Sequence, residues 1–145
     1  EEGDQLRWVR RSKVEDSIII GSRHGMAIHF RTNHEQLRPL GRATRGVRAM
    51  ALRDGDELIG MDILPSQIVN NIAEADESES AEEIQLVAGQ GPCVLVITMG
   101  GYGKRVPISQ FRLQNRAGLG VLSTKFRKAK DKLAALRVVN EEDEL

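Results

Sequence analysis

The sequence GRATRGV at residues 41–47 returns as NRAGLGV at residues 115–121. Arg, Ala, Gly and Val occupy matching places, and each stretch follows an apolar run, a Gly-centred turn and a second short apolar run. An Asp-x-Leu triplet lies downstream of both and also near the start of the chain, at residues 4–6, 56–58 and 131–133. Repeats built from such short runs are typical of propeller-like arrays, in which each unit packs against its neighbour.

The short apolar runs, separated by Gly, Asn, Asp and Pro, predict an all-β antiparallel protein. We expect strands at residues 5–11, 17–22, 26–31, 46–52, 57–63, 93–98, 103–108, 120–126 and 132–139. Two longer arginine-containing segments lie between expected strands: the first connection, residues 32–45, and the second connection, residues 109–119. A connection of this length in a compact unit is either functional or well packed.

The repeats divide the chain into five parts. Residues 14–64 and 92–139 are each expected to form one blade, and residues 1–13 to supply the last strand of a preceding blade. Residues 65–91 contain an acidic, aromatic-free run that predicts a disordered inter-blade linker, and residues 140–145 form the acidic start of the next connection. We interpret the acidic run as a solvated insertion; the alternative is a polyanion mimic that competes for a basic surface.

The formal net charge is zero, but the charges are unevenly distributed. Residues 92–139 hold ten Lys or Arg against one acid, a net charge of +9. Residues 17–63 hold seven Arg against five acids, a net charge of +2, whereas residues 64–91 hold six acids and no base. A concentrated basic region is the electrostatic signature of a polyanionic partner. The second repeat is therefore expected to provide most of the affinity for such a partner.

Basic residues cluster in and beside the two connections, and cations spaced over successive units can follow a duplex backbone through salt-dependent phosphate contacts. The chain has one Trp, one Tyr and three Phe, which disfavours single-strand binding by base stacking and favours backbone contacts with duplex DNA. The alternative is a solvated basic face without a partner. The candidate DNA contacts are Arg38, Arg42, Arg45, Arg48, Lys104, Arg105, Arg112, Arg116, Lys125, Arg127 and Lys128.

The sequence offers little for catalysis, and we expect no catalytic residue, metal or cofactor in this chain. His24, His29 and His34 lack the Cys or Glu partners of a metal site. The single cysteine, Cys93, lies in an apolar run and cannot form an internal disulfide. GGYGK at residues 100–104 lacks the spacing of a phosphate loop and is interpreted as a hairpin turn. No apolar stretch approaches the roughly 20 residues of a membrane span, so no membrane partner is expected.

GYGKRVP at residues 101–107, followed by Phe111 and Arg112, resembles the C-terminal domain of the DNA gyrase A protein. GRATRGV, GDELIGMD at residues 55–62 and NRAG at residues 115–118 support a resemblance that covers nearly the whole chain outside the acidic linker. Domains of that family are β-pinwheels, in which neighbouring four-stranded blades exchange a strand. The resemblance implies about two four-stranded antiparallel blades, with residues 5–11 completing a blade whose remainder lies outside the chain.

The resemblance further implies that a basic rim wraps duplex DNA and supports ATP-dependent negative supercoiling by a complete type II topoisomerase. The breakage tyrosine and the ATPase site of such an enzyme belong to other domains, so this chain would be a non-catalytic part, and ATP and Mg²⁺ would be used by the holoenzyme. Implied partners are duplex DNA, the remaining blades, the gyrase A core and the gyrase B protein in an A2B2 assembly. The rim residues in matching motifs are Arg42, Arg45, Lys104, Arg105, Arg112 and Arg116.

The chain also departs from the family, because the glycine-rich basic box QRRGGKG does not occur in it. The sequence of residues 110–116 and the acidic insertion resemble those of cyanobacterial or plastid relatives. We therefore expect a cytoplasmic protein if the source is bacterial, or a plastid or mitochondrial one if it is a plant or alga, and not a secreted one. Two alternatives remain: the C-terminal domain of the topoisomerase IV A protein, and a propeller-like module whose basic blade docks an acidic protein tail.

Overall fold

The computed structural model describes residue 3, residues 5–67, residues 91–140 and residue 143. Its elements in chain order are β1 (Ser17–Ser22), β2 (Met26–Arg31), β3 (Leu58–Leu64), β4 (Cys93–Thr98), β5 (Gly103–Pro107), the 3-10 turn η1 (Ile108–Gln110), β6 (Val121–Leu122) and β7 (Leu133–Val139). The expected all-β antiparallel class is confirmed. Within the described residues no helix is long and apolar enough to cross a membrane.

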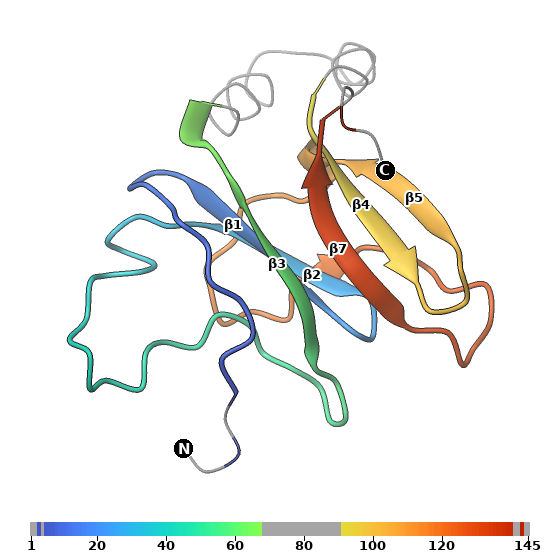
Figure 1. Ribbon diagram of the computed structural model, residues 1–145, viewed down its shortest axis with the longest axis horizontal. Coiled ribbons are helices and arrows are strands. Elements are labelled where there is room, and N and C mark those ends of the chain that lie inside the picture. The colour runs from blue at the N-terminus through green and yellow to red at the C-terminus, as the bar shows by residue number, and fades with distance from the viewer. Residues whose placement is uncertain (1–2, 4, 68–90, 141–142, 144–145) are drawn as a thin grey trace.

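The first sheet, sheet A, has the strand order β3-β1-β2-β6. Its first three strands come from the first repeat, whereas β6 comes from the second repeat and pairs with β2 through Met26↔Leu122 and Ala27↔Val121. The chain reaches this edge at Gly120, whose φ of +78° favours glycine and whose backbone lies against the Ala27 carbonyl so closely that a Cβ would not fit. The strand exchange implied by the resemblance is thus present between the two repeats (Figure 1).

The second sheet, sheet B, has the order β5-β4-β7. It repeats the first three strands of sheet A in register: Ile18 pairs with Phe30 in sheet A, and Val94 pairs with Val106 in sheet B. Sheet A has four strands, as expected for a blade, but its fourth strand is β6 and not the expected strand at residues 46–52. Within the described residues sheet B has three strands. Sheet B lacks a fourth strand because β6, which belongs to the same repeat as β4, β5 and β7, pairs with β2 of sheet A instead.

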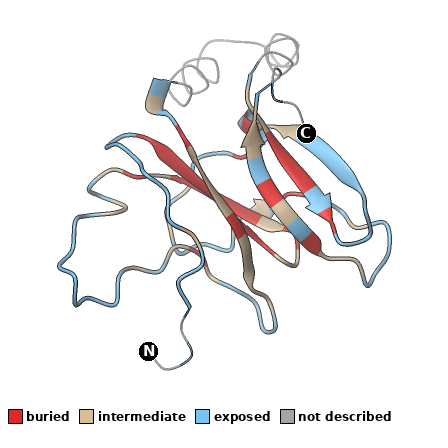
Figure 2. Cartoon of the chain, viewed as in Figure 1, coloured by how far each residue is buried: buried red, intermediate tan, exposed pale blue. Residues whose placement is uncertain are grey.

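The two sheets face each other through β3 and β7 (Figure 1). Figure 2 shows the buried residues concentrated on the strands of the two sheets. One hydrophobic core fills the space between the sheets, with Ile19 and Leu64 of sheet A and Leu133 and Leu136 of sheet B fully or almost fully buried. Leu136 lies so close to β3 that a Cβ on Gly60 would come within 3.0 Å of its carbonyl oxygen. The inter-sheet contact therefore depends on a glycine in the facing strand.

A second core covers the opposite face of sheet A. Ile18 and Ile20 point to this face, alternating with Ile19, and they pack with Phe30 and Met50. Leu37 of the first connection packs against the same cluster. Because both faces of β1 are covered, all six of its residues are buried, which explains its continuous apolar sequence. Leu37 therefore packs the first part of this connection against sheet A, ahead of the exposed residues 38–45.

The repeated Asp-x-Leu triplet has the same structural role in both sheets. Asp56 accepts hydrogen bonds from the Ser22 hydroxyl at 2.6 Å and from the backbone N–H groups of His24 and Glu57, both at 2.9 Å. Asp131 likewise accepts from the backbone N–H groups of Gly100 and Lys132 at 2.8 Å. Asp56 thus fixes the β1–β2 turn to the start of β3, and Asp131 fixes the β4–β5 turn to the start of β7.

Three strand expectations need correction. Residues 5–11 form no strand, and Leu6 and Val9 are 88% and 71% exposed, because no described strand lies beside them to provide a hydrogen-bonded edge. Residues 46–52 also form no strand and make isolated backbone bonds to the second connection instead. Of residues 120–126 only β6 is a strand, because just two residues lie along the β2 edge.

The acidic linker expected at residues 65–91 and the acidic segment at residues 140–145 lie almost wholly outside the described residues.

Candidate nucleic-acid interface

The first connection projects from sheet A as a long excursion on one side of the molecule (Figure 1). It begins with a turn in which Asn33 accepts a hydrogen bond from the backbone of Gln36, and a second turn is closed by Thr44, whose N–H and hydroxyl both donate to the Gly41 carbonyl. Side chains between these turns have little to pack against. The predicted contacts on and just after this connection are all exposed, namely Arg38, Arg42, Arg45 and Arg48.

The second connection crosses sheet A and runs beside the first. Three backbone hydrogen bonds join it to the first repeat. The N–H groups of Gln114 and Ala117 donate to the carbonyls of His29 at 2.8 Å and Ala49 at 2.7 Å. In the third bond, the Ala51 N–H donates to the Gly118 carbonyl at 2.9 Å. Residues more than 65 positions apart in the sequence are thereby brought together. In this arrangement Arg116 contacts the backbone of Arg48, and Arg112 lines a cleft together with Arg31.

Arg112 and Arg116 have different environments. Arg112 is exposed, and within the described part of the chain its guanidinium has no hydrogen-bond or ion-pair partner. Arg116 is half-buried: its Nε donates to the Gln36 carbonyl at 2.7 Å, and its Nη1 donates to the Arg48 carbonyl at 3.2 Å. Arg116 therefore uses part of its guanidinium inside the protein, which its position in the sequence motif does not reveal.

The two connections border an open cleft of about 610 Å³. Its wall is mostly polar, with Asn33 and Gln36 from the first connection and Arg112, Gln114 and Asn115 from the second. The amide of Gln36 joins the two sides, because its Nε2 donates to Asn115 Oδ1 at 3.0 Å. A polar cleft beside exposed arginines suits a hydrated anionic partner better than an apolar ligand.

A buried histidine anchors the second connection to sheet A. His29 on β2 lies with Nδ1 2.7 Å from the Phe111 carbonyl and Nε2 2.6 Å from the Ser17 hydroxyl. Burial lowers the pKa of His29, the bond to Phe111 opposes this shift, and Arg31 adds to it. The neutral imidazole accordingly donates from Nδ1 to Phe111 and accepts from Ser17 at Nε2. This histidine is structural, which agrees with the absence of metal-site spacing around it.

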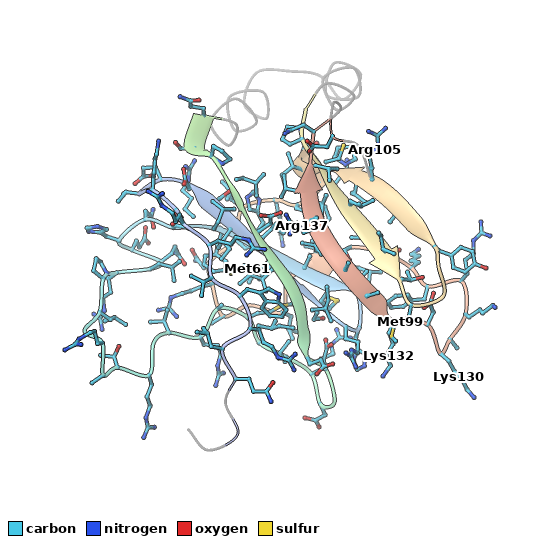
Figure 3. The ribbon with its side chains drawn as sticks, in the orientation of Figure 1. Met61, Met99, Arg105, Lys130, Lys132 and Arg137 are labelled. Carbon is cyan, nitrogen blue, oxygen red and sulfur yellow. The ribbon has the colours of Figure 1, made fainter. Side chains whose placement is uncertain are left out.

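The remaining predicted contacts come from β5 and from the segment between β6 and β7, which starts against the β1–β2 turn at Gly25. Lys104 and Arg105 are exposed on β5, an edge strand, and Lys125, Arg127 and Lys128 are exposed on the segment between β6 and β7. Arg127 lies over the ring of Tyr102 at 5.0 Å from its centroid. Figure 3 shows Arg105 and Lys130 well apart. The eleven candidates thus divide into a group in and just after the connections and a group on β5 and the β6–β7 segment.

Sequence reasoning missed Gln36, which bonds to both Asn115 and Arg116. A glutamine in a polar connection carries no distinguishing pattern, so no sequence signal could have found it. Exposed Lys130 was counted in the charge but not named as a contact. Among the described residues, no group of three or more His, Cys, Asp or Glu side chains is placed to hold a metal ion.

The exchanged strand and the paired sheets define the class: an all-β, propeller-like repeat protein with basic connections on its surface. The model of one family, described as the DNA gyrase C-terminal domain, beta-propeller, matches residues 16–65 and 94–140. The chain belongs to this family, as the motifs at residues 41–47 and 101–107 indicate.

Relatives with similar sequences are gyrase A proteins, in agreement with the family match. The DNA gyrase A protein of Synechocystis is 58% identical over 152 residues, which cover 99% of this chain and 18% of the relative. The chloroplastic/mitochondrial DNA gyrase A protein of Nicotiana benthamiana is 38% identical, covering 94% of this chain and 14% of the relative. The chain therefore spans less than a fifth of the length of these relatives.

Solved structures share the fold at low sequence identity. The E. coli ParC C-terminal domain matches with a TM-score of 0.65 at 16% identity and covers 97% of this chain and 48% of that one. The DNA gyrase A C-terminal domain matches with a TM-score of 0.58 at 17% identity, over 89% of this chain and 33% of that one. These matches confirm the pinwheel-type β-propeller fold.

Proposed function

We propose that this chain binds and wraps duplex DNA as the C-terminal domain of a DNA gyrase A protein. The supporting observation is that the two arginine-bearing connections, from successive repeats, lie side by side with Arg38, Arg42 and Arg112 exposed. Exposed cations on adjacent connections can contact a phosphate backbone without reading bases. Family membership and the name of the Synechocystis relative support the same function.

In this proposal the wrapped DNA passes along both groups of cations. The first group provides Arg38, Arg42, Arg45, Arg48 and Arg112. The second group extends the path with Lys104 and Arg105 of β5 and with Lys125, Arg127 and Lys128 of the β6–β7 segment. Arg116 lies beside the first group and, being half-buried, offers less of its guanidinium to DNA. Within a complete type II topoisomerase, this wrapping would present a DNA segment to the cleavage core and support negative supercoiling.

The proposed partners are the rest of the gyrase A chain, including further blades, and the gyrase B protein in an A2B2 assembly. Residues 14–64 and 92–139 would act as two blades, and residues 5–11 would complete a preceding one. The use of Mg²⁺ and ATP is assigned to other parts of the assembly, in keeping with the family. The proposed location is the bacterial cytoplasm or, for a plant or algal source, the plastid or mitochondrion.

The first experiment titrates fluorescent duplexes of several unrelated sequences with the chain across a salt series. Backbone binding predicts equal affinity for all duplexes. It also predicts a salt slope, the slope of log binding constant against log salt concentration, of about −0.9 per neutralised phosphate. Salt-insensitive binding to an acidic protein tail, without duplex binding, would instead support the interaction-module alternative.

The second experiment separates wrapping from binding. The chain is incubated with nicked circular DNA, the nick is ligated, and the linking number is measured after the protein is removed. Wrapping leaves a shift in linking number that grows with bound protein, whereas binding without wrapping leaves none. A full-length gyrase A protein carrying this chain, assembled with its gyrase B partner, then tests ATP-dependent supercoiling directly.

A further inference from the structure

We propose that Arg116 is a positioning residue that closes the base of the arginine loop, residues 37–47, and sets where its arginines stand. The inference rests on the proposed DNA-binding function, because the loop carries Arg38, Arg42 and Arg45. The motif match makes Arg116 a candidate phosphate contact equivalent to Arg42. The two residues nevertheless have different surroundings, and this difference carries the inference.

Arg116 contacts both ends of the arginine loop. Its Nε donates to the Gln36 carbonyl at 2.7 Å, immediately before the loop, and its Nη1 donates to the Arg48 carbonyl at 3.2 Å, immediately after it. Its backbone N–H also donates to Gln36 Oε1 at 3.0 Å. One side chain thereby joins the residue just before the loop to the residue just after it.

Neighbouring bonds make this joint rigid. Gln36 Nε2 donates to Asn115 Oδ1 at 3.0 Å, so the residue before Arg116 is held by the same glutamine. Ala117 N–H donates to the Ala49 carbonyl at 2.7 Å on the other side of the joint. Arg116 is therefore fixed from both directions, and the loop ends cannot separate without breaking these bonds.

The joint requires the geometry of arginine. A guanidinium carries donors on separate nitrogens in a planar fork, so one side chain can reach two carbonyls at once. Lysine has the same charge but carries all its donors on one nitrogen, so it cannot occupy both positions. A phosphate contact, by contrast, depends mainly on charge, and lysine can replace arginine there. Arginine-to-lysine substitution therefore separates the two roles.

The repeat supplies a matched control, because Arg42 occupies in the first repeat the motif position that Arg116 occupies in the second. Arg42 is exposed, whereas Arg116 is half-buried. The variants R42K, R42Q, R116K and R116Q are made in the full 145-residue chain, and circular dichroism with thermal unfolding verifies that each folds. Duplex affinity and its salt slope are then measured for all four.

We expect the affinity of R42K to stay within about twofold of the original. In R42Q the salt slope should become shallower by about 0.9, the contribution of one phosphate contact. We expect R116K to lose affinity as R116Q does, about tenfold, although its charge is unchanged. Trypsin should cleave after Arg42 and Arg45 several-fold faster in both Arg116 variants than in the original chain. Original affinity in R116K combined with a loss in R116Q would overturn the inference and identify Arg116 as a phosphate contact.

A measurement on the unsubstituted chain keeps the inference testable if the Arg116 variants do not fold. In ¹⁵N-labelled protein, the Arg116 Nε–H should exchange slowly with solvent before DNA is added and change little afterwards. The Arg42 Nε–H should become protected only when duplex is bound. Fast exchange of Arg116 in the free chain would overturn the inference. Failure of the unsubstituted chain to bind any duplex would overturn the proposed function instead, and loop cleavage and Nε–H exchange would still decide whether the loop is closed by Arg116.

Discussion

The imidazole Nδ1 of His29 lies 2.7 Å from the carbonyl oxygen of Phe111, although 82 positions separate the two residues in the sequence. This hydrogen bond joins the second strand of the first repeat to the connection of the second repeat. It therefore holds Arg112, the next residue along the chain, near β2, where Arg112 lines the same cleft as Arg31.

Substitution of His29 should change how stability depends on pH. Its pKa is lowered from 6.5, chiefly by burial, so the unfolded chain binds the proton at a higher pH than the folded chain does. The free energy of unfolding should therefore decrease as the pH falls through 6.5 toward the lower folded-state pKa. His29→Leu should remove this component and also cost about 1–3 kcal/mol, because the Ser17 hydroxyl and Phe111 carbonyl lose their partner. Urea unfolding between about pH 5 and pH 8 measures both effects, and an identical pH slope in the variant would contradict the assignment.

Alanine at Gly120 and at Gly46 should have different costs. The φ angles are nearly equal, +78° and +77°, but a Cβ on Gly120 would meet the Ala27 backbone, whereas nothing lies within 4 Å of one on Gly46. Gly46→Ala should cost about 1–2 kcal/mol from the left-handed backbone conformation alone. Gly120→Ala should cost about 3 kcal/mol or more, because β6 must also move away from β2. Equal unfolding midpoints for the two variants in urea would disprove the close contact.

Asp56→Asn should weaken the β1–β2 turn. Burial raises the pKa of Asp56, but its hydrogen bonds from Ser22, His24 and Glu57 outweigh burial and hold the pKa below 3.8. The carboxylate therefore contributes stability above pH 3.8 that is lost as the pH falls through the lower folded-state value. We expect Asp56→Asn to cost about 1–3 kcal/mol near pH 7 and less near pH 3. Ser22→Ala, which removes one of the same bonds, serves as a control that should give a smaller loss.

The inter-sheet core should be sensitive to Leu136. Its side chain is 1% exposed and belongs to the cluster between sheets A and B. Leu136→Ala should lower the free energy of unfolding by about 2–5 kcal/mol. Leu6, at 88% exposed, provides a control of the same chemistry, and Leu6→Ala should change stability by less than about 0.5 kcal/mol. Thermal unfolding of both variants makes the comparison.

Removal of the charge at Arg112 should weaken duplex binding uniformly. Its guanidinium is exposed and has no partner within the described residues, so Arg112→Gln should leave the fold intact. If Arg112 neutralises one phosphate, the salt slope should become shallower by about 0.9 for every duplex sequence. Arg53→Gln, an equal change of charge at another exposed site outside the candidate set, should leave the slope unchanged. A loss confined to one duplex sequence would point to base contact instead.

Much of the fold followed from local pattern. The apolar run at Ile18–Ile20 and the turn glycines predicted β1, β2 and their counterparts in sheet B, because apolar runs and turn conformation are properties of neighbouring residues. The expected strands at residues 5–11 and 46–52 were wrong for the opposite reason. A strand needs a hydrogen-bonded edge from another segment, and apolar alternation does not reveal whether that edge is present.

The sequence by itself determined the all-β class, the two-fold repeat, the family and the set of basic side chains, since each of these is written in local motifs and composition. Only the tertiary structure decided that β6 joins sheet A, that His29 anchors the second connection, and that Arg116 is held where Arg42 is exposed. Arg42 and Arg116 share a motif position, yet the bonds of Arg116 reach Gln36 and Arg48, 80 and 68 residues away. Hydrogen bonds over such separations depend on how the repeats pack together, so a motif that is read locally cannot specify them.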